Sequence, residues 1–133
     1  MEPGAASGRV AYASEMLLPL IGARLHGWLD DLVVLVYLLG AFLLPLRGPA
    51  LALGIGGASV HFLLTRFTNY PQGTFKRIPF RVHAFIELGE GIVVAAATAL
   101  FLRALPTAAF AFLLAMGASQ LGAFAFSNYD PTS

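Results

Sequence analysis

Four long apolar segments constrain the fold of this chain more than any other feature of its sequence. They run over residues 26–46, 50–67, 83–102 and 107–126, and the stretches between them contain proline and glycine. A helix needs roughly 20 mainly apolar residues to cross the hydrocarbon core of a bilayer, so each segment is long enough to span a membrane. Inside lipid the backbone must satisfy its own hydrogen bonds, and the alternating polarity of β-barrel strands is missing, which leaves helix as the expected conformation.

The composition agrees with this interpretation. Of 133 residues, 58% are hydrophobic and only 11% are charged, whereas an average soluble domain is about one quarter charged. The chain contains no cysteine, which excludes disulfides, zinc–thiolate sites and iron–sulfur clusters. A formal net charge of +1 provides no general attraction to nucleic acid, so we expect no nucleic-acid partner.

The short turns within each pair of segments predict two helical hairpins in tandem. We assign residues 1–25 to a flexible N-terminus with a short interfacial segment, 26–67 to the first transmembrane hairpin, 68–82 to a cytoplasmic loop, 83–129 to the second hairpin and 130–133 to a C-terminal tail. The predicted fold class is therefore an all-α membrane protein with four transmembrane helices.

The distribution of basic residues predicts the orientation. Two of them flank the hairpin tips, Arg47 and Arg103, while six lie near the N-terminus or the central loop: Arg9, Arg24, Arg66, Lys76, Arg77 and Arg81. Since Lys and Arg accumulate on the cytoplasmic side, both termini and the 68–82 loop should be cytoplasmic. We expect the protein in the plasma membrane of a bacterium.

The two hairpins repeat one another in sequence. "RLHGWLD" at 24–30 returns as "RVHAFIE" at 81–87, and "GASVHFLLTRFTNY" at 57–70 resembles "GASQLGAFAFSNY" at 117–129. Two copies of a unit that crosses the membrane an even number of times have the same orientation. They should therefore be related by a pseudo-twofold axis along the membrane normal.

This duplication, the His-x-x-x-acid pattern and the stretch "TNYPQGTFKRIPFRVHAFIE" resemble the small bacterial membrane proteins known as SPW-repeat proteins. The resemblance covers residues 26 to about 129. The Ser-Pro-Trp motif that names the family is absent, since the corresponding stretches read "LLGAFLLP" and "ATALFLRA". The resemblance implies the four-helix architecture and carries no established activity.

Polar groups gather at the heads of the hairpins. Residues four apart share one face of a helix, so His26 can pair with Asp30 and His83 with Glu87. Glu90 should extend the His83 face, and His61 should reach the same level from the end of the second helix. The predicted polar or ligand layer consists of His26, Asp30, His61, His83, Glu87 and Glu90.

Several interpretations of this layer remain open from the sequence. The simplest is structural, because buried carboxylates need partners in a bilayer. Histidine and carboxylate ligands also suit iron, manganese or zinc, although the Glu-x-x-His pattern of di-metal bundles is absent. Two histidines at one level could ligate a haem or chlorin, and Asp30, Glu87 and Glu90 could conduct protons or ions. We predict no cofactor and keep these as alternatives.

Further residues have expected roles in packing and contact. Small residues spaced four apart predict close helix packing, within this chain or with a partner, at Gly54, Ala58, Ala118 and Gly122, and packing within the chain is favoured. Arg66, Lys76, Arg77 and Arg81 should contact anionic lipid or a partner. Trp28, Tyr70 and Tyr129 lie where amphipathic aromatic side chains anchor a span at the membrane interface.

No Ser-His-Asp arrangement, Walker loop or dinucleotide-binding loop is present. We therefore expect no enzymatic activity. The sequence favours a non-catalytic accessory or scaffold subunit of a larger membrane complex, energy-transducing complexes included, whose partners are the lipid bilayer and other membrane subunits.

Overall fold

The computed structural model describes residues 20–133, and residues 1–19 of the predicted N-terminal segment 1–25 lie outside the described part. The described part contains four helices, α2 (Ala23–Leu43), α3 (Gly48–Phe67), α4 (Phe80–Phe101) and α5 (Thr107–Phe126). Each is long and apolar enough to cross a membrane. Apart from two isolated bridges, Ile21 with Ser127 and Thr68 with Ile78, no β-structure occurs within residues 20–133. The predicted all-helical class with four spans is confirmed.

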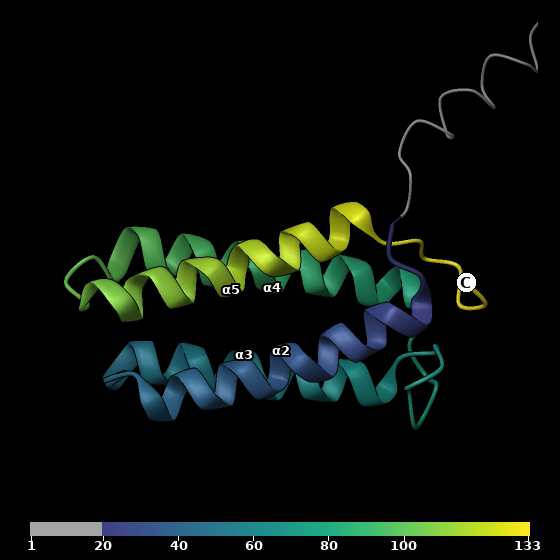
Figure 1. Cartoon of the computed structure of the whole chain (residues 1–133), viewed down its shortest axis with the longest axis horizontal. Coiled ribbons are helices and arrows are strands. Elements are labelled where there is room, and N and C mark those ends of the chain that lie inside the picture. The colour runs from purple at the N-terminus through teal and green to yellow at the C-terminus, as the bar shows by residue number, and fades with distance from the viewer. Residues whose placement is uncertain (1–19) are drawn as a thin grey trace, which may run out of the picture.

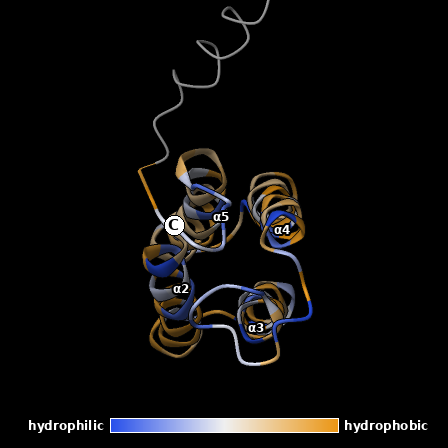
Figure 2. Cartoon of the chain, turned by 90° about the vertical axis from the view of Figure 1, so that its right-hand side faces the viewer, coloured by the Kyte–Doolittle hydropathy of each residue, from blue (hydrophilic) through white to orange (hydrophobic). Residues whose placement is uncertain are grey.

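The helices form two antiparallel hairpins that lie against each other (Figure 1). Within a hairpin, α2 packs on α3 and α4 on α5 along much of their length, whereas contacts between the hairpins are sparse. Seen from the end, the helices occupy the corners of a square in which α2 neighbours α5 and α3 neighbours α4 (Figure 2). The C-terminus and the loop after α3 lie at one end of the bundle, and the two hairpin tips lie at the other.

Proline defines the start of three helices. Pro49 lies in the first turn of α3, and Pro79 and Pro106 are the N-caps of α4 and α5. Proline is tolerated there because the first N–H groups of a helix have no partner within the helix. Helix α4 consequently begins directly after Pro79, three residues before the predicted start at His83.

Glycine permits close contact between α4 and α5. A Cβ added to Gly117 would lie 2.8 Å from the backbone nitrogen of Ala95, and one added to Gly91 would lie 3.0 Å from the carbonyl oxygen of Gly117. Of the predicted α5 positions, Ala118 is exposed, and a Cβ at Gly122 would meet nothing within 4 Å among the described residues. Neither residue packs on α4, and their contact with a partner stays a prediction. The sequence spacing was right for a helix but one residue away from the face that meets α4.

The small residues of α3 lie where they were expected. Gly54 and Ala58 are buried, and Ala58 packs in a cluster with Tyr37 and Met116. Gly57, between them, lies directly against the ring of Tyr37, because an added Cβ would lie 2.9 Å from that ring. Close approach of α2 and α3 therefore depends on small α3 side chains.

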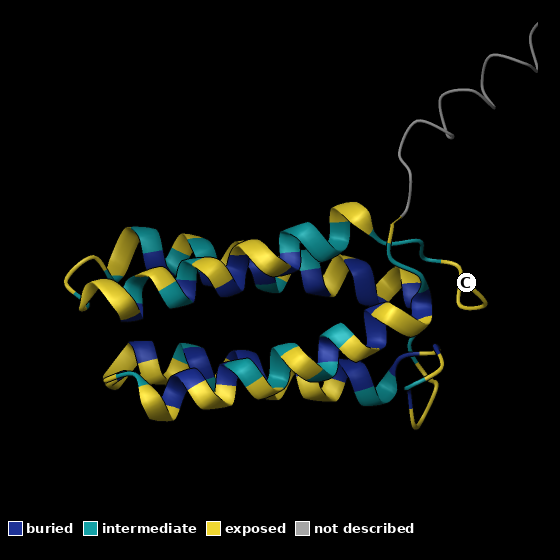
Figure 3. Cartoon of the chain, viewed as in Figure 1, coloured by how far each residue is buried: buried dark blue, intermediate teal, exposed yellow. Residues whose placement is uncertain are grey.

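Large apolar side chains point outward. Phe42, Leu43, Val93 and Phe101 are each at least 60% exposed, whereas the buried residues turn toward the bundle interior (Figure 3). A soluble protein rarely exposes such a continuous apolar surface. This surface is the one that meets lipid, so the chain is a small integral membrane protein.

The loop between α3 and α4 folds back over the end of the bundle. The N–H groups of Thr74 and Phe75 donate to the carbonyl oxygen of Arg66 at 2.8 and 2.9 Å. Gly73 approaches the backbone of Thr68 so closely that no other residue fits there. Tyr70 turns inward and is 2% exposed, which corrects its predicted role as an interfacial anchor: the hairpin repeat ends in a tyrosine that faces the polar layer and not the lipid.

Candidate functional site

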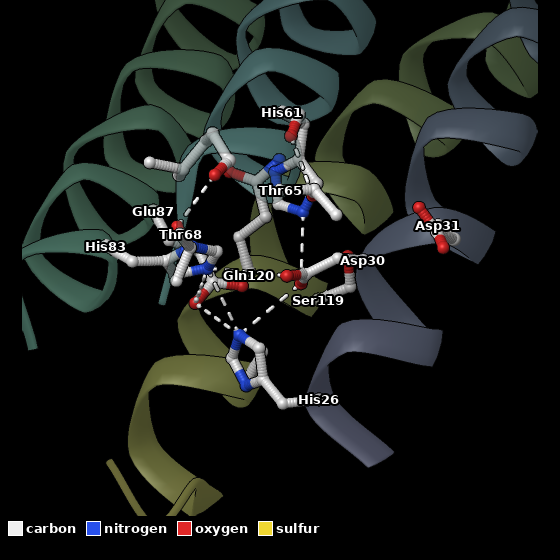
Figure 4. Close-up of polar contacts among 12 residues, drawn as sticks. His26, Asp30, Asp31, His61, Thr65, Thr68, His83, Glu87, Ser119 and Gln120 are labelled. Atoms are coloured by element: carbon white, nitrogen blue, oxygen red, sulfur yellow. Dashed lines mark hydrogen bonds and ion pairs between the residues drawn. The ribbon is translucent and has the colours of Figure 1, made fainter. Parts of the chain in front are cut away.

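The structure brings the six residues of the predicted polar layer together in one cluster at the loop end of the bundle (Figure 4). Helix α2 supplies His26 and Asp30, α3 supplies His61, and α4 supplies the other three: His83, Glu87 and Glu90. Five of the six residues are at most 1% exposed, and Glu90 is partly buried. The cluster therefore lies between the two hairpins and ties them together.

Two imidazoles meet at its centre. The Nε2 atoms of His26 and His83 lie 3.2 Å apart. The other ring nitrogen of each faces a hydroxyl from the end of the opposite hairpin: His26 Nδ1 is 2.7 Å from Ser127 Oγ, and His83 Nδ1 is 2.8 Å from Thr68 Oγ1. These contacts are reciprocal, as the predicted pseudo-twofold axis would require, although the axis itself stays a prediction.

Hydrogen-bond partners indicate the tautomer of His83. Thr68 Oγ1 donates its only proton to the carbonyl oxygen of Leu64 at 2.7 Å. It must therefore accept the proton of His83 Nδ1, and the lone pair of His83 Nε2 points into the cluster. A hydrogen bond on the outer nitrogen that leaves the inner nitrogen bare is the usual arrangement of a metal-binding histidine.

Two carboxylates complete a group of four donors. Asp30 Oδ1 lies 3.4 Å from His26 Nε2, and Asp30 Oδ2 lies 3.5 Å from His83 Nε2. Glu87 Oε2 lies 3.5 Å from His26 Nε2 and 3.9 Å from His83 Nε2. It makes no hydrogen bond with any residue from 20 to 133. One donor atom from each of the four residues can be chosen so that all lie within 4.8 Å of one another.

Several separations between these donors are close to those of a small tetrahedral metal site. With metal–ligand bonds of about 2.0–2.1 Å, tetrahedral ligand atoms lie about 3.3–3.4 Å apart. The separations that involve the two imidazoles run from 3.2 to 3.9 Å. With one donor atom from each residue the separations extend up to 4.8 Å, so His26, Asp30, His83 and Glu87 would have to close around one ion by side-chain movement.

His61 forms a second part of the layer, next to these four residues. Its Nε2 lies 3.3 Å from Asp30 Oδ1, and its Nδ1 lies 3.1 Å from Glu90 Oε2. Sequence reasoning placed Glu90 on the His83 face and left its partner open, and the structure gives it His61 as a partner. Each of the two bonds needs a proton, which either the imidazole or the facing carboxyl group must carry.

Four contributing residues were not recognised in the sequence as part of the layer. Tyr70 donates a 2.7 Å hydrogen bond to Asp30 Oδ2, while Thr68 and Ser127 orient the two histidines. Gln120, one turn deeper on α5, is fully buried and donates to Tyr37 at 3.0 Å. The signal for the first three was the repeated ending "FTNY" and "FSNY", which had been noted only as a mark of duplication.

The basic residues in the loop and at the adjoining helix ends have different environments. Arg66 forms an ion pair with Asp31 of α2 and lies over the ring of Phe62. Lys76, Arg77 and Arg81 are exposed. Contact of these side chains with anionic lipid or a partner stays a prediction.

These features define the chain as a four-helix integral membrane protein with a buried histidine–carboxylate cluster between its hairpins. In comparisons with protein-family models, curated proteins and solved structures, nothing matches the chain. The resemblance to SPW-repeat proteins therefore stays a prediction, and the function has to be argued from the cluster.

Proposed function

We propose that this membrane protein binds one divalent transition-metal ion through His26, Asp30, His83 and Glu87, and that the ion holds the two hairpins together. The observation that carries the proposal is the convergence of four buried donor residues, with one donor atom from each within 4.8 Å of the others. One of these donors, Glu87 Oε2, makes no hydrogen bond within the described chain. Two imidazoles and two carboxylates suit zinc, iron or manganese, and tetrahedral geometry favours zinc.

Charge balance supports a divalent ion. Asp30 and Glu87 carry two negative charges when ionised, and a buried carboxylate in a bilayer is costly unless it is compensated. A divalent cation neutralises both. A doubly protonated His61 would then balance Glu90, so the whole layer would carry no net charge.

The other ligand hypotheses receive less support from the geometry. A haem or chlorin between His26 and His83 would have to displace the carboxylates that surround the two Nε2 atoms. Proton conduction would need polar groups along the bundle axis, but the described interior toward the hairpin tips is an apolar cluster that includes Ala41, Leu46 and Leu113.

Four protein ligands leave no open coordination position, which is typical of structural and not catalytic zinc. The site therefore favours the non-catalytic role expected from the sequence. We further propose that the protein is an accessory or scaffold subunit of a larger membrane complex. Mild detergent extraction of the native protein followed by mass spectrometry should find co-purifying membrane subunits. A chain that purifies alone as a monomer would contradict this part.

Metal binding is tested on the purified full-length chain by elemental analysis and by titration of chelator-treated protein with Zn²⁺. We expect one zinc per chain, and at a free concentration 100 times Kd the ion should add about 2.7 kcal/mol to the free energy of unfolding. Absence of both stoichiometric zinc and a stability increase would overturn the proposal.

Neighbouring aspartates provide a matched control. Asp30→Asn should abolish stoichiometric binding, because the amide is a poor ligand and carries no charge. Asp31→Asn changes the adjacent residue, which pairs with Arg66 outside the donor set, and should leave zinc binding unchanged. Equal binding by the two variants would place the ion elsewhere.

A further inference from the structure

A groove between α2 and α5 leads from the lipid-facing surface to the polar layer. Its volume is about 410 Å³, within the range of small-ligand sites. Its walls are mostly apolar and include Leu29, Val33, Val36 and Met116, while the polar residues Asp30, Ser119, Glu87 and Gln120 also line it. The groove lies between neighbouring helices of different hairpins, where contacts are sparse (Figure 2).

One of the polar side chains that line this groove, Gln120, has an oxygen atom that accepts no hydrogen bond from the described residues. The side chain is completely buried, and its Nε2 donates to the hydroxyl of Tyr37 at 3.0 Å. Its Oε1 has no hydrogen-bond partner in the described chain. An unsatisfied acceptor at membrane depth is costly, and only a hydrogen-bond donor can satisfy it.

We propose that the groove binds a membrane-soluble amphiphile whose neutral hydroxyl group donates to Gln120 Oε1 and whose apolar chain lies between α2 and α5. The groove is also lined by Glu87, whose Oε2 has no hydrogen-bond partner in the described chain and is assigned to the metal ion by the proposed function. Asp30 is already bonded to Tyr70 and His61. With the ion bound, the remaining free acceptor is the amide oxygen of Gln120, so an uncharged donor fits better than an ammonium group. Gln120 is not one of the four proposed metal ligands, but Asp30 and Glu87 line the groove as well, so the choice of a neutral donor rests on the proposed function.

Three probes with the same chain test the proposal: 1-decanol, decyl methyl ether and decylammonium. The full-length protein is reconstituted in lipid nanodiscs, and thermal unfolding is followed at increasing mole fraction of each probe, with and without a chelator. Wild-type protein should need about tenfold less decanol than ether for the same rise in Tm, corresponding to one buried hydrogen bond of about 1.4 kcal/mol. The preference should persist in chelator, which distinguishes this site from the metal centre.

Two substitutions locate the preference. Gln120→Leu keeps the side-chain volume and removes the acceptor. The concentrations of alcohol and ether that give the same rise in Tm should then agree within about twofold. Because this ratio is measured within one variant, it does not depend on that variant's own stability. Ala115→Phe should fill the groove and reduce the effect of both probes, whereas Ala96→Phe on the exposed surface of α4 should not. The proposal is overturned if alcohol and ether act equally on the wild type, if Gln120→Leu retains the preference, or if decylammonium acts on the zinc-loaded protein at the lowest concentration.

Discussion

Each central imidazole is held by a hydroxyl from the opposite hairpin. Ser127 Oγ contacts His26 and Thr68 Oγ1 contacts His83 through the ring nitrogen that points away from the cluster. Such outer partners fix the orientation and the tautomer of a ligand histidine. They convert two mobile side chains into a preformed pair.

Removing either hydroxyl should therefore weaken metal binding without removing a ligand. We expect Ser127→Ala and Thr68→Val each to lower zinc affinity about 10- to 100-fold, as measured by competition with a chromogenic chelator. Thr68→Ser keeps the hydroxyl and should restore most of the affinity. If both hydroxyl-free variants bind zinc like the wild type, the histidines are oriented by something else.

Two tyrosines at the ends of the hairpins make stability sensitive to high pH. Burial and the nearby Asp30 carboxylate raise the pKa of the Tyr70 hydroxyl, and burial raises the pKa of Tyr129. The folded protein thus keeps these protons at a pH where the unfolded chain has lost them. Their contribution is complete below the ordinary phenol pKa of about 10 and is lost as the pH rises above it.

We expect the free energy of unfolding to fall progressively between about pH 9.5 and 12. Tyr70→Phe removes the ionisable proton together with the hydrogen bond to Asp30, so it should be less stable at neutral pH but less sensitive to alkali. Denaturant titrations at a series of pH values measure both effects. An identical slope against pH in wild type and Tyr70→Phe would contradict this assignment.

Packing between α4 and α5 depends on which glycines face the partner helix. Gly91 of α4 and Gly117 of α5 lie where the two helices meet. Gly122, also on α5, faces open space among the described residues. Small residues allow backbones to approach closely in membranes, where dispersion contacts drive helix association.

Substitution should separate these two environments. Gly117→Val should destabilise the protein by about 1–3 kcal/mol, because the added carbons meet the backbone of α4. Gly122→Ala should be neutral or stabilise it by up to about 1 kcal/mol, since alanine is the better helix former. Unfolding in mixed micelles with increasing denaturing detergent measures both, and a larger loss for Gly122→Ala would show that α5 packs with a different face.

Across the whole molecule, the loop after α3 and the C-terminus share one end of the bundle (Figure 1). The basic residues predict that this end is cytoplasmic. Because the chain has no cysteine, single cysteines report orientation without background. Lys76→Cys and Ser133→Cys should react with a membrane-impermeant maleimide only after cell lysis, whereas Ala104→Cys at a hairpin tip should react in intact cells. The reverse pattern would invert the assigned orientation.

Residue types alone determined the number and positions of the spans. The predicted fourth span, 107–126, coincides with α5, and the starts of the two hairpins differ from prediction by three residues, because polar His26 and His83 were taken as the beginning of helices that start at Ala23 and Phe80. The composition of the polar layer was also predictable, since periodicity places residues four apart on one face. The partner of Glu90 could not be predicted, because which side chain it meets depends on the distance between helices.

The sequence by itself determined four apolar helices with paired histidines and carboxylates, because a long apolar segment in lipid has to satisfy its backbone hydrogen bonds as a helix. Only the tertiary structure decided which donors meet. It placed His26 opposite His83, turned Tyr70 and Thr68 inward and selected Gly117 over Gly122 for packing. The reason is that register and rotation between hairpins are determined by side-chain shape and by hydrogen bonds between residues 15 to 101 positions apart in the sequence, which no local pattern encodes.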